Sequence, residues 1–153
     1  MDNFVIQRIQ QMVFGLLPEG DRFLLGTLLR DNCSEVARLV ANWIGEAEPS
    51  SRLIILKGTN VCGTARSHDI VAAIDSGGNI VIIDPTIWQF FPEAESILVS
   101  RFDNLGSALE KIETRYGGKW SVSEEFSKLS DEDEKKYRAI IVQNAQENLK
   151  EPS

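Results

Sequence analysis

Apolar residues recur at helical spacing over residues 3–17, where one of them falls at every third or fourth position. Such a stripe indicates an amphipathic helix. The sequence Pro-Glu-Gly at 18–20 interrupts the pattern, because proline and glycine both end helices. Leucines are then frequent over residues 21–30, which predict a second, shorter helix.

A third helix is expected from Cys33 to about Ile44, with Gly45 as its stop. Asp31 and Asn32 precede it, and both are residue types that favour the N-cap position. Cys33 shares the inward apolar stripe of this helix. Its thiol is therefore predicted on the buried side of the first turn.

Apolar runs of strand length follow in the middle of the chain. Residues 52–57 predict a buried strand. Residues 69–75 and 79–84 flank a turn rich in glycine and predict a β-hairpin that Pro85 ends. Farther along, residues 120–126 predict either a short strand or an extended arm.

Two more helices are predicted near the C-terminus. Residues 105–116 carry apolar residues at helical spacing and close at a Gly-Gly pair. Ser130 is predicted to cap a last helix over about 130–150, whose acidic first turn suits the helix dipole. The predicted order of helices, a small antiparallel sheet and further helices indicates an α+β fold. The length of the chain predicts a single domain over residues 1–153.

Composition fits a globular protein, with 42% hydrophobic and 25% charged residues. The net charge of −7 argues against nonspecific binding to nucleic acid or to anionic membranes. Two cysteines and the lack of a long apolar run indicate a reducing compartment and no membrane span. No basic segment of a signal peptide opens the chain, so it is expected in the cytoplasm as synthesised. Export, or delivery into a target cell by a separate system, stays open.

The candidate chemistry rests on a thiol, an imidazole and a carboxylate. They are Cys33, the single histidine His68, and Asp84. Residues of these types can form a thiolate nucleophile with an oriented base. A thiol at a helix N-terminus is also activated by the helix dipole and by unpaired backbone N–H groups.

The hairpin register decides whether the imidazole can reach the carboxylate. If Asp75 pairs with Asn79, Asp84 lies opposite Ile70, and His68 stands two residues away on the same face. That diagonal brings the two side chains within hydrogen-bonding reach. A register that differs by one residue places them on opposite faces of the sheet.

Plainer interpretations exist for each residue. Cys33 can be a buried structural cysteine, His68 a satisfied core residue, and Asp84 a turn-former before proline. Cys62 is a rival thiol, although no helix follows it to activate it. A Cys-Cys-His metal site is disfavoured, because neither C-x-x-C nor H-x-x-x-H spacing occurs.

Residues 32–39, 67–71 and 82–86 together show a cysteine opening a helix, a histidine on a strand and an aspartate on the next strand. In these motifs the chain resembles the papain-like (transglutaminase-like) thiol enzymes. The compact spacing is most similar to the small papain-fold domains of toxins and effectors, several of which are protein-glutamine deamidases. The resemblance covers about residues 20–100. It implies a papain-like fold, with N-terminal helices packed on a small antiparallel sheet.

The resemblance also implies a domain layout and residue roles. The papain-like core would span about residues 20–126, and the acidic helix over about 130–150 would follow it. Cys33 would be the nucleophile, His68 the general base and Asp84 the residue that orients the base.

Further site residues are expected beside this triad. The glutamine that papain-type peptidases place before the cysteine is missing from residues 24–31. The Asn32 side chain or the Cys33 backbone amide would then hold the oxyanion, and Trp88 would line the substrate cleft. Neither a metal nor a cofactor is expected.

The function implied is a thiol hydrolase that acts on carboxamides, foremost a protein-glutamine deamidase working through a thioester. A cysteine peptidase of the same mechanism is one alternative, and a catalytically inactive protein-binding domain is another. The expected partner is a protein substrate, with neither nucleic acid nor membrane involved. The oligomeric state stays open.

Overall fold

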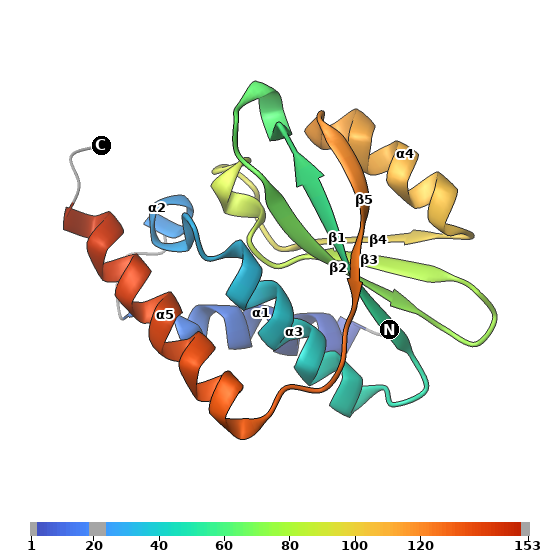
Figure 1. The fold of residues 1–153 in the computed structure, drawn as a ribbon, viewed down its shortest axis with the longest axis horizontal. Helices are drawn as coiled ribbons and strands as arrows, with labels where there is room; N and C mark the ends of the chain where they lie inside the picture. Colours follow the sequence, from blue (N-terminus) through green and yellow to red (C-terminus); the bar gives the residue numbers. More distant parts are fainter. Residues whose placement is uncertain (1–2, 19–23, 151–153) are drawn as a thin grey trace.

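The structure is a computed structural model that describes residues 3–18 and 24–150. Within them the chain forms five α-helices and one antiparallel sheet of five strands, which confirms the predicted α+β class (Figure 1). The elements in chain order are α1 (Asn3–Leu16), α2 (Leu25–Leu29), α3 (Cys33–Ala47), β1 (Arg52–Thr59), the 3-10 turn η2 (Val61–Gly63), β2 (His68–Ile74), β3 (Ile80–Asp84), the 3-10 turn η3 (Ile87–Gln89), β4 (Leu98–Phe102), α4 (Leu105–Tyr116), β5 (Lys119–Glu125) and α5 (Asp131–Lys150).

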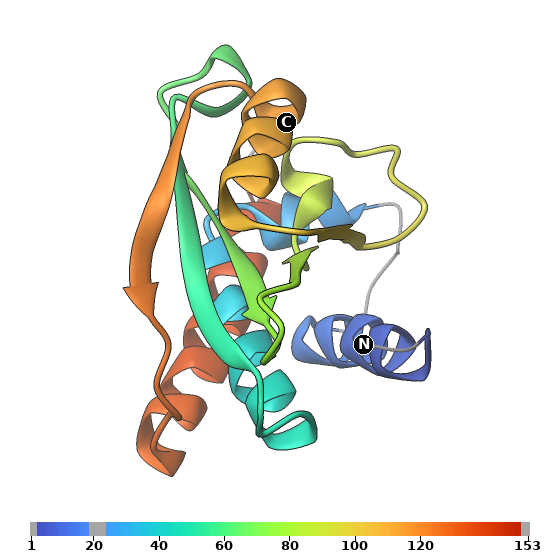
Figure 2. The same cartoon turned by 90° about the vertical axis from the view of Figure 1, so that its right-hand side faces the viewer.

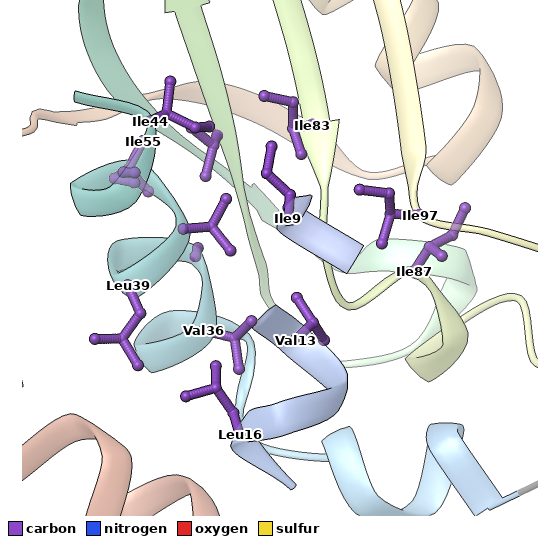
Figure 3. Close-up of a cluster of buried hydrophobic side chains, with 14 of the residues drawn as sticks. Ile9, Val13, Leu16, Val36, Leu39, Ile44, Ile55, Ile83, Ile87 and Ile97 are labelled. Carbon is purple, nitrogen blue, oxygen red and sulfur yellow. The ribbon is translucent and has the colours of Figure 1, made fainter. Parts of the chain in front are cut away.

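Helices cover both faces of the sheet, whose strand order is β4-β3-β2-β1-β5. On one face, α1, α3 and α5 form a core with alternate strand residues; Figure 3 shows part of it, with Ile9, Val36 and Ile83 gathered together. On the other face, α4 covers a second core that includes Ile70 and Ile82. Figure 2 shows β1 and β5 running side by side at the edge of the sheet.

The hairpin adopts the register that the candidate site requires. The backbone N–H of Asp75 donates to the carbonyl of Asn79 at 3.0 Å, and Val71 pairs with Ile83. One carboxylate oxygen of Asp75 also accepts a hydrogen bond from the Asn79 N–H at 3.0 Å, which holds the turn closed. His68 therefore lies on the same face of the sheet as Asp84.

Most predicted helices are confirmed. Those over 3–17 and 105–116 appear as α1 and α4, and the Ser130 hydroxyl caps α5 by accepting from the Asp133 N–H at 3.1 Å. Of the helix predicted over 21–30, the last part forms α2. Residues 19–23, which hold the predicted Glu-Gly break and the start of that helix, lie outside the described residues.

The third helix continues beyond its predicted end. α3 runs to Ala47, so the prediction that Gly45 stops it is wrong. A Cβ atom at Gly45 would come within 3.2 Å of the Leu53 Cδ1 atom on β1. The glycine therefore allows the helix and the strand to pack closely, and it does not terminate the helix.

The strands differ from the prediction at the sheet edges. Residues 120–126 mostly belong to β5, which resolves that segment as a strand. The pattern misses β4, because its side chains are only partly buried and show no clear alternation. Backbone pairing with β3 defines this strand, and such pairing leaves little trace in a single sequence.

One further property follows from the helices. No helix in residues 3–18 or 24–150 is both long enough and apolar enough to cross a lipid bilayer.

Gly58 allows the closest contact between β1 and β5. It lies opposite His68 on β2 and Trp120 on β5, and a Cβ atom there would stand 2.4 Å from the Trp120 ring. We expect Gly58→Ala to lower the free energy of unfolding by about 1–3 kcal/mol, because the indole must move in a packed core. Urea unfolding at pH 7 measures this change.

Gly15 provides the matched control. It is exposed on α1, and a Cβ atom there would meet nothing within 4 Å. Gly15→Ala should stabilise the protein by about 0.5–1 kcal/mol through helix propensity. Equal effects of the two substitutions would contradict the close packing of Trp120 on Gly58.

Candidate active site

The structure brings His68 and Asp84 together at one end of the sheet. His68 begins β2, Asp84 ends β3, and both side chains are completely buried. The imidazole Nε2 lies 2.8 Å from a carboxylate oxygen of Asp84. The hairpin register of β2 and β3 thus brings these two residues into the hydrogen-bonded pair that the candidate site needs.

The Asp84 carboxylate is held by two other donors as well. The Tyr116 hydroxyl, at the end of α4, donates to the same oxygen that His68 contacts. The backbone N–H of Thr86 donates to the second oxygen at 3.1 Å. Burial, followed by the charge of Asp84, raises the pKa of Tyr116, so this hydroxyl keeps its proton and acts as a donor.

Aromatic rings enclose the imidazole. Its centroid lies 4.8 Å from that of Phe90, in an edge-on arrangement, and 5.7 Å from that of Tyr116. The Trp120 ring stands edge-on at 6.2 Å. The three aromatic side chains keep water from the faces of the imidazole, which strengthens the electrostatic interaction between His68 and Asp84.

Cys33 lies near the imidazole of His68. It is the first residue of α3 and is partly exposed, and it is one of the groups that raise the pKa of His68. Nδ1 is the ring nitrogen left for the thiol, since Nε2 faces Asp84. Among the described residues Nδ1 has no hydrogen-bond partner, so any contact with the thiol is a loose one.

The charge state of His68 results from opposing influences. Burial lowers its pKa, but the charge of Asp84 and the hydrogen bond to Asp84 outweigh burial, and Cys33 adds to their effect. Together they raise the pKa of His68 to about 10. At neutral pH the ring is therefore an imidazolium.

An arginine joins the helix that carries Cys33 to the strand that carries His68. Arg38 Nη1 donates to the Ser34 carbonyl in the first turn of α3 and to the carboxylate of Asp69, which follows His68, each at 3.0 Å. Its Nη2 pairs with Glu124 of β5 at 2.7 Å. Because these side chains are partly buried, the contacts limit sliding of α3 along β2.

The Asn32 side chain is turned away from this site. It is buried, and its amide donates to the carbonyls of Leu28 at 3.0 Å and Ile141 at 3.1 Å. Its oxygen accepts from Asn144 at 3.1 Å. The amide thus donates one hydrogen bond to α2 and one to α5, so these bonds do not support the oxyanion role predicted for this side chain.

Trp88 is also placed elsewhere. Only 3% of it is exposed, its indole N–H donates to the Ala94 carbonyl at 2.7 Å, and its ring packs near Phe14 of α1. It is part of the core at η3, and the hollow that it lines with Phe14 and Pro92 includes neither Cys33 nor His68. The aromatic side chain that lies against His68 is Phe90.

Cys62 does not share the environment of Cys33. It is exposed in η2, and partial burial raises its pKa, which disfavours its thiolate. Both thiols are free, so no disulfide joins them. In the part of the chain that the structure describes, no three His, Cys, Asp or Glu side chains are arranged to hold a metal ion.

Sequence reasoning missed Tyr116 and Arg38 as parts of the site. Tyr116 continues the apolar stripe of its helix, and Arg38 is one polar residue of the helix that begins at Cys33. Neither position carries a local signal for its contact with Asp84 or Asp69. The contacts arise from the packing of α4 and α3 against the sheet.

Comparisons with known proteins add no relative. Scans against family models, curated proteins and solved structures each find no match to this chain.

Tyr116→Phe removes one donor from the buried Asp84 carboxylate. We expect it to lower the free energy of unfolding by about 1.5–3 kcal/mol, the usual range for a hydrogen bond to a charged group. Urea unfolding at pH 7 checks this. The control is Tyr137→Phe in α5, a half-buried tyrosine of the other core, which should change stability by less than about 0.5 kcal/mol.

Stability should fall with rising pH because of His68. Its pKa is raised from 6.5 to about 10 on folding, so its contribution is complete below about pH 6.5 and is lost as pH rises through about 10. Between these values the free energy of unfolding should fall by up to about 1.4 kcal/mol per pH unit. Urea unfolding in a Cys62→Ser background at pH 7, 8 and 9 measures the slope. His68→Gln should flatten it, and an unchanged slope in that variant would contradict the assignment.

Proposed function

We propose that this chain is a cysteine-dependent amide hydrolase of the papain-like type, and foremost a protein-glutamine deamidase. One observation carries the proposal. The buried imidazole of His68 has Nε2 bonded to Asp84, its Nδ1 is left without a hydrogen-bond partner among the described residues, and the thiol at the start of α3 lies near enough to raise its pKa. A nucleophile, a base and a residue that orients the base have this mutual arrangement in thiol hydrolases.

The first step forms a thioester. The Cys33 thiolate attacks the carbonyl carbon of a glutamine side chain, and the resulting intermediate expels its nitrogen. The His68 imidazolium gives a proton to that nitrogen, so ammonia leaves and the acyl group stays on sulfur. The neutral imidazole that remains is the base for the second step.

The second step consumes water. His68 removes a proton from a water molecule as the oxygen attacks the thioester carbon, and the carbon–sulfur bond breaks. A glutamate side chain leaves, and the thiolate and the imidazolium are restored. One water is used and one ammonia is released per turnover.

Asp84 orients the imidazole during both steps. The Tyr116 hydroxyl and the Thr86 N–H hold the carboxylate, so the ring presents the same nitrogen to the thiol throughout. The oxyanion of each intermediate would be stabilised by the backbone N–H of Cys33. N–H groups in the first turn of a helix lack intrahelical partners and lie at the positive end of its dipole.

A side-chain carboxamide suits this site better than a peptide bond does. Cys33 is only partly exposed and the imidazole is fully buried, so a narrow side chain can reach the thiol more readily than an extended backbone. A peptidase of the same mechanism is the alternative. The two differ in product, because a peptidase cleaves its target and a deamidase raises the target mass by about one dalton for each glutamine converted.

The two cysteines make a matched test. Cys33→Ala should reduce ammonia release from glutamine-containing peptides by about 10³-fold or more, because it removes the nucleophile. Cys62→Ser should leave release unchanged. An enzymatic ammonia assay, with mass spectrometry of the peptides, measures both outcomes.

Thiol chemistry tests the proposal without a known substrate. In the Cys62→Ser background, iodoacetamide should alkylate Cys33 rapidly at pH 7, and His68→Gln should slow it markedly by removing the imidazolium. If Cys33 of the folded protein reacts no faster than a simple thiol and His68→Gln changes nothing, the chain is a binding domain and not an enzyme.

A further inference from the structure

A guanidinium group stands one aromatic ring away from the imidazole. Arg66 precedes His68 by two residues, and its Cζ atom lies 4.8 Å from the centroid of Phe90. The Phe90 centroid is in turn 4.8 Å from that of His68. Arg66 is half-buried and Cys33 is partly exposed, so both side chains can meet a molecule that binds from solvent.

The Arg66 side chain is held in place from several directions. Its Nη2 donates to the Gln89 side-chain oxygen at 3.2 Å, and the Gln89 amide donates to the Leu29 carbonyl at 2.6 Å. Leu29 ends α2, just before the turn that leads to Cys33. The backbone of Arg66 is fixed as well, because its carbonyl accepts from the Val61 N–H at 3.1 Å. A cation fixed in this way gives up little conformational freedom when it binds an anion.

Arg66 differs in its partners from three arginines that pair with carboxylates. These pairs are Arg38 with Asp69 and Glu124, Arg52 with Glu125, and Arg138 with Glu134. Within the described residues no carboxylate pairs with Arg66, although the chain has 23 acidic residues. Its one side-chain hydrogen bond goes to a neutral amide oxygen and leaves most of its five N–H donors unused.

We infer that Arg66 is a specificity-determining residue that binds a carboxylate of the protein substrate while the neighbouring glutamine side chain is at Cys33. This inference rests on the proposed function and narrows its substrate class to glutamines in acidic segments. Guanidinium binds carboxylate in a bidentate manner, and the contact with the Phe90 ring restricts the motion of the Arg66 side chain.

Two alkylating reagents test the inference at Cys33 without a protein substrate. Iodoacetate is an anion and iodoacetamide is its neutral counterpart, so the ratio of their rates at Cys33 reports the positive charge close to the thiol. In the Cys62→Ser background we expect Arg66→Gln to lower this ratio about fivefold, the size of the attraction between two unit charges about 4 Å apart in bulk water. Any change in the thiolate fraction of Cys33 alters both rates equally and cancels in the ratio.

Two further variants separate charge from structure. Arg66→Lys keeps the charge and should keep most of the ratio, which a role confined to bracing Gln89 would not predict. Arg52→Gln, at an exposed arginine of β1 that pairs with Glu125, should leave the ratio unchanged. Added salt should lower the ratio in the parent protein, which gives a measurement that needs no substitution.

Peptide substrates extend the test to the proposed reaction. The parent protein should deamidate a glutamine flanked by glutamate with a higher kcat/KM than one flanked by alanine. Arg66→Glu should reverse the order in favour of a lysine-flanked glutamine. Mass spectrometry of the products gives the rates.

The outcomes separate the two proposals. If Cys33 is reactive and glutamine is deamidated, but Arg66→Gln changes neither the reagent ratio nor the preference for acidic peptides, the inference about Arg66 is overturned and the enzyme function stands. If Cys33 is inert in every variant, both are overturned. A ratio that falls with Arg66→Gln and survives Arg66→Lys supports the inference.

Discussion

A carboxylate buried as completely as that of Asp84 has to be compensated by charge and hydrogen bonds, and this requirement organises one end of the molecule. His68 supplies the positive charge, and Tyr116 and the Thr86 N–H supply the remaining hydrogen bonds. These donors come from β2, from the end of α4 and from the turn after β3. The packing of α4 against the sheet and the position of the imidazole therefore depend on the same carboxylate.

The same arrangement determines the chemical state of the imidazole. Asp84 offsets the cost of burying a charged ring, so His68 is protonated at neutral pH within an aromatic enclosure. Its second nitrogen has no hydrogen-bond partner among the described residues, and Arg38 ties α3, which carries Cys33, to β2. A loose contact between the thiol and the ring is compatible with a nucleophile that must leave the ring to attack a carbonyl carbon. Stability and proposed chemistry thus share one network of contacts.

The candidate site was predictable to the extent that it depends on local rules. The Ser-Gly-Gly turn and Asp75 determine the hairpin register, and that register places His68 and Asp84 on one face. The thiol at the start of α3 follows from the helical pattern. Asn32 and Trp88 were assigned to the site because of their positions along the chain. In the structure α5 occupies the amide of Asn32, and the core beneath η3 takes up the indole of Trp88.

The sequence alone determined the α+β class, the boundaries of most helices and the hairpin. It also determined the three residue types that the proposed chemistry needs. These properties depend on hydrophobic periodicity and on turn residues, which act over a few neighbouring positions. Only the tertiary structure decided that Tyr116 would hold Asp84, that Phe90 would separate Arg66 from His68, and that Gly45 would sit inside a helix. Such contacts join residues far apart along the chain, and their geometry depends on how whole helices pack against the sheet.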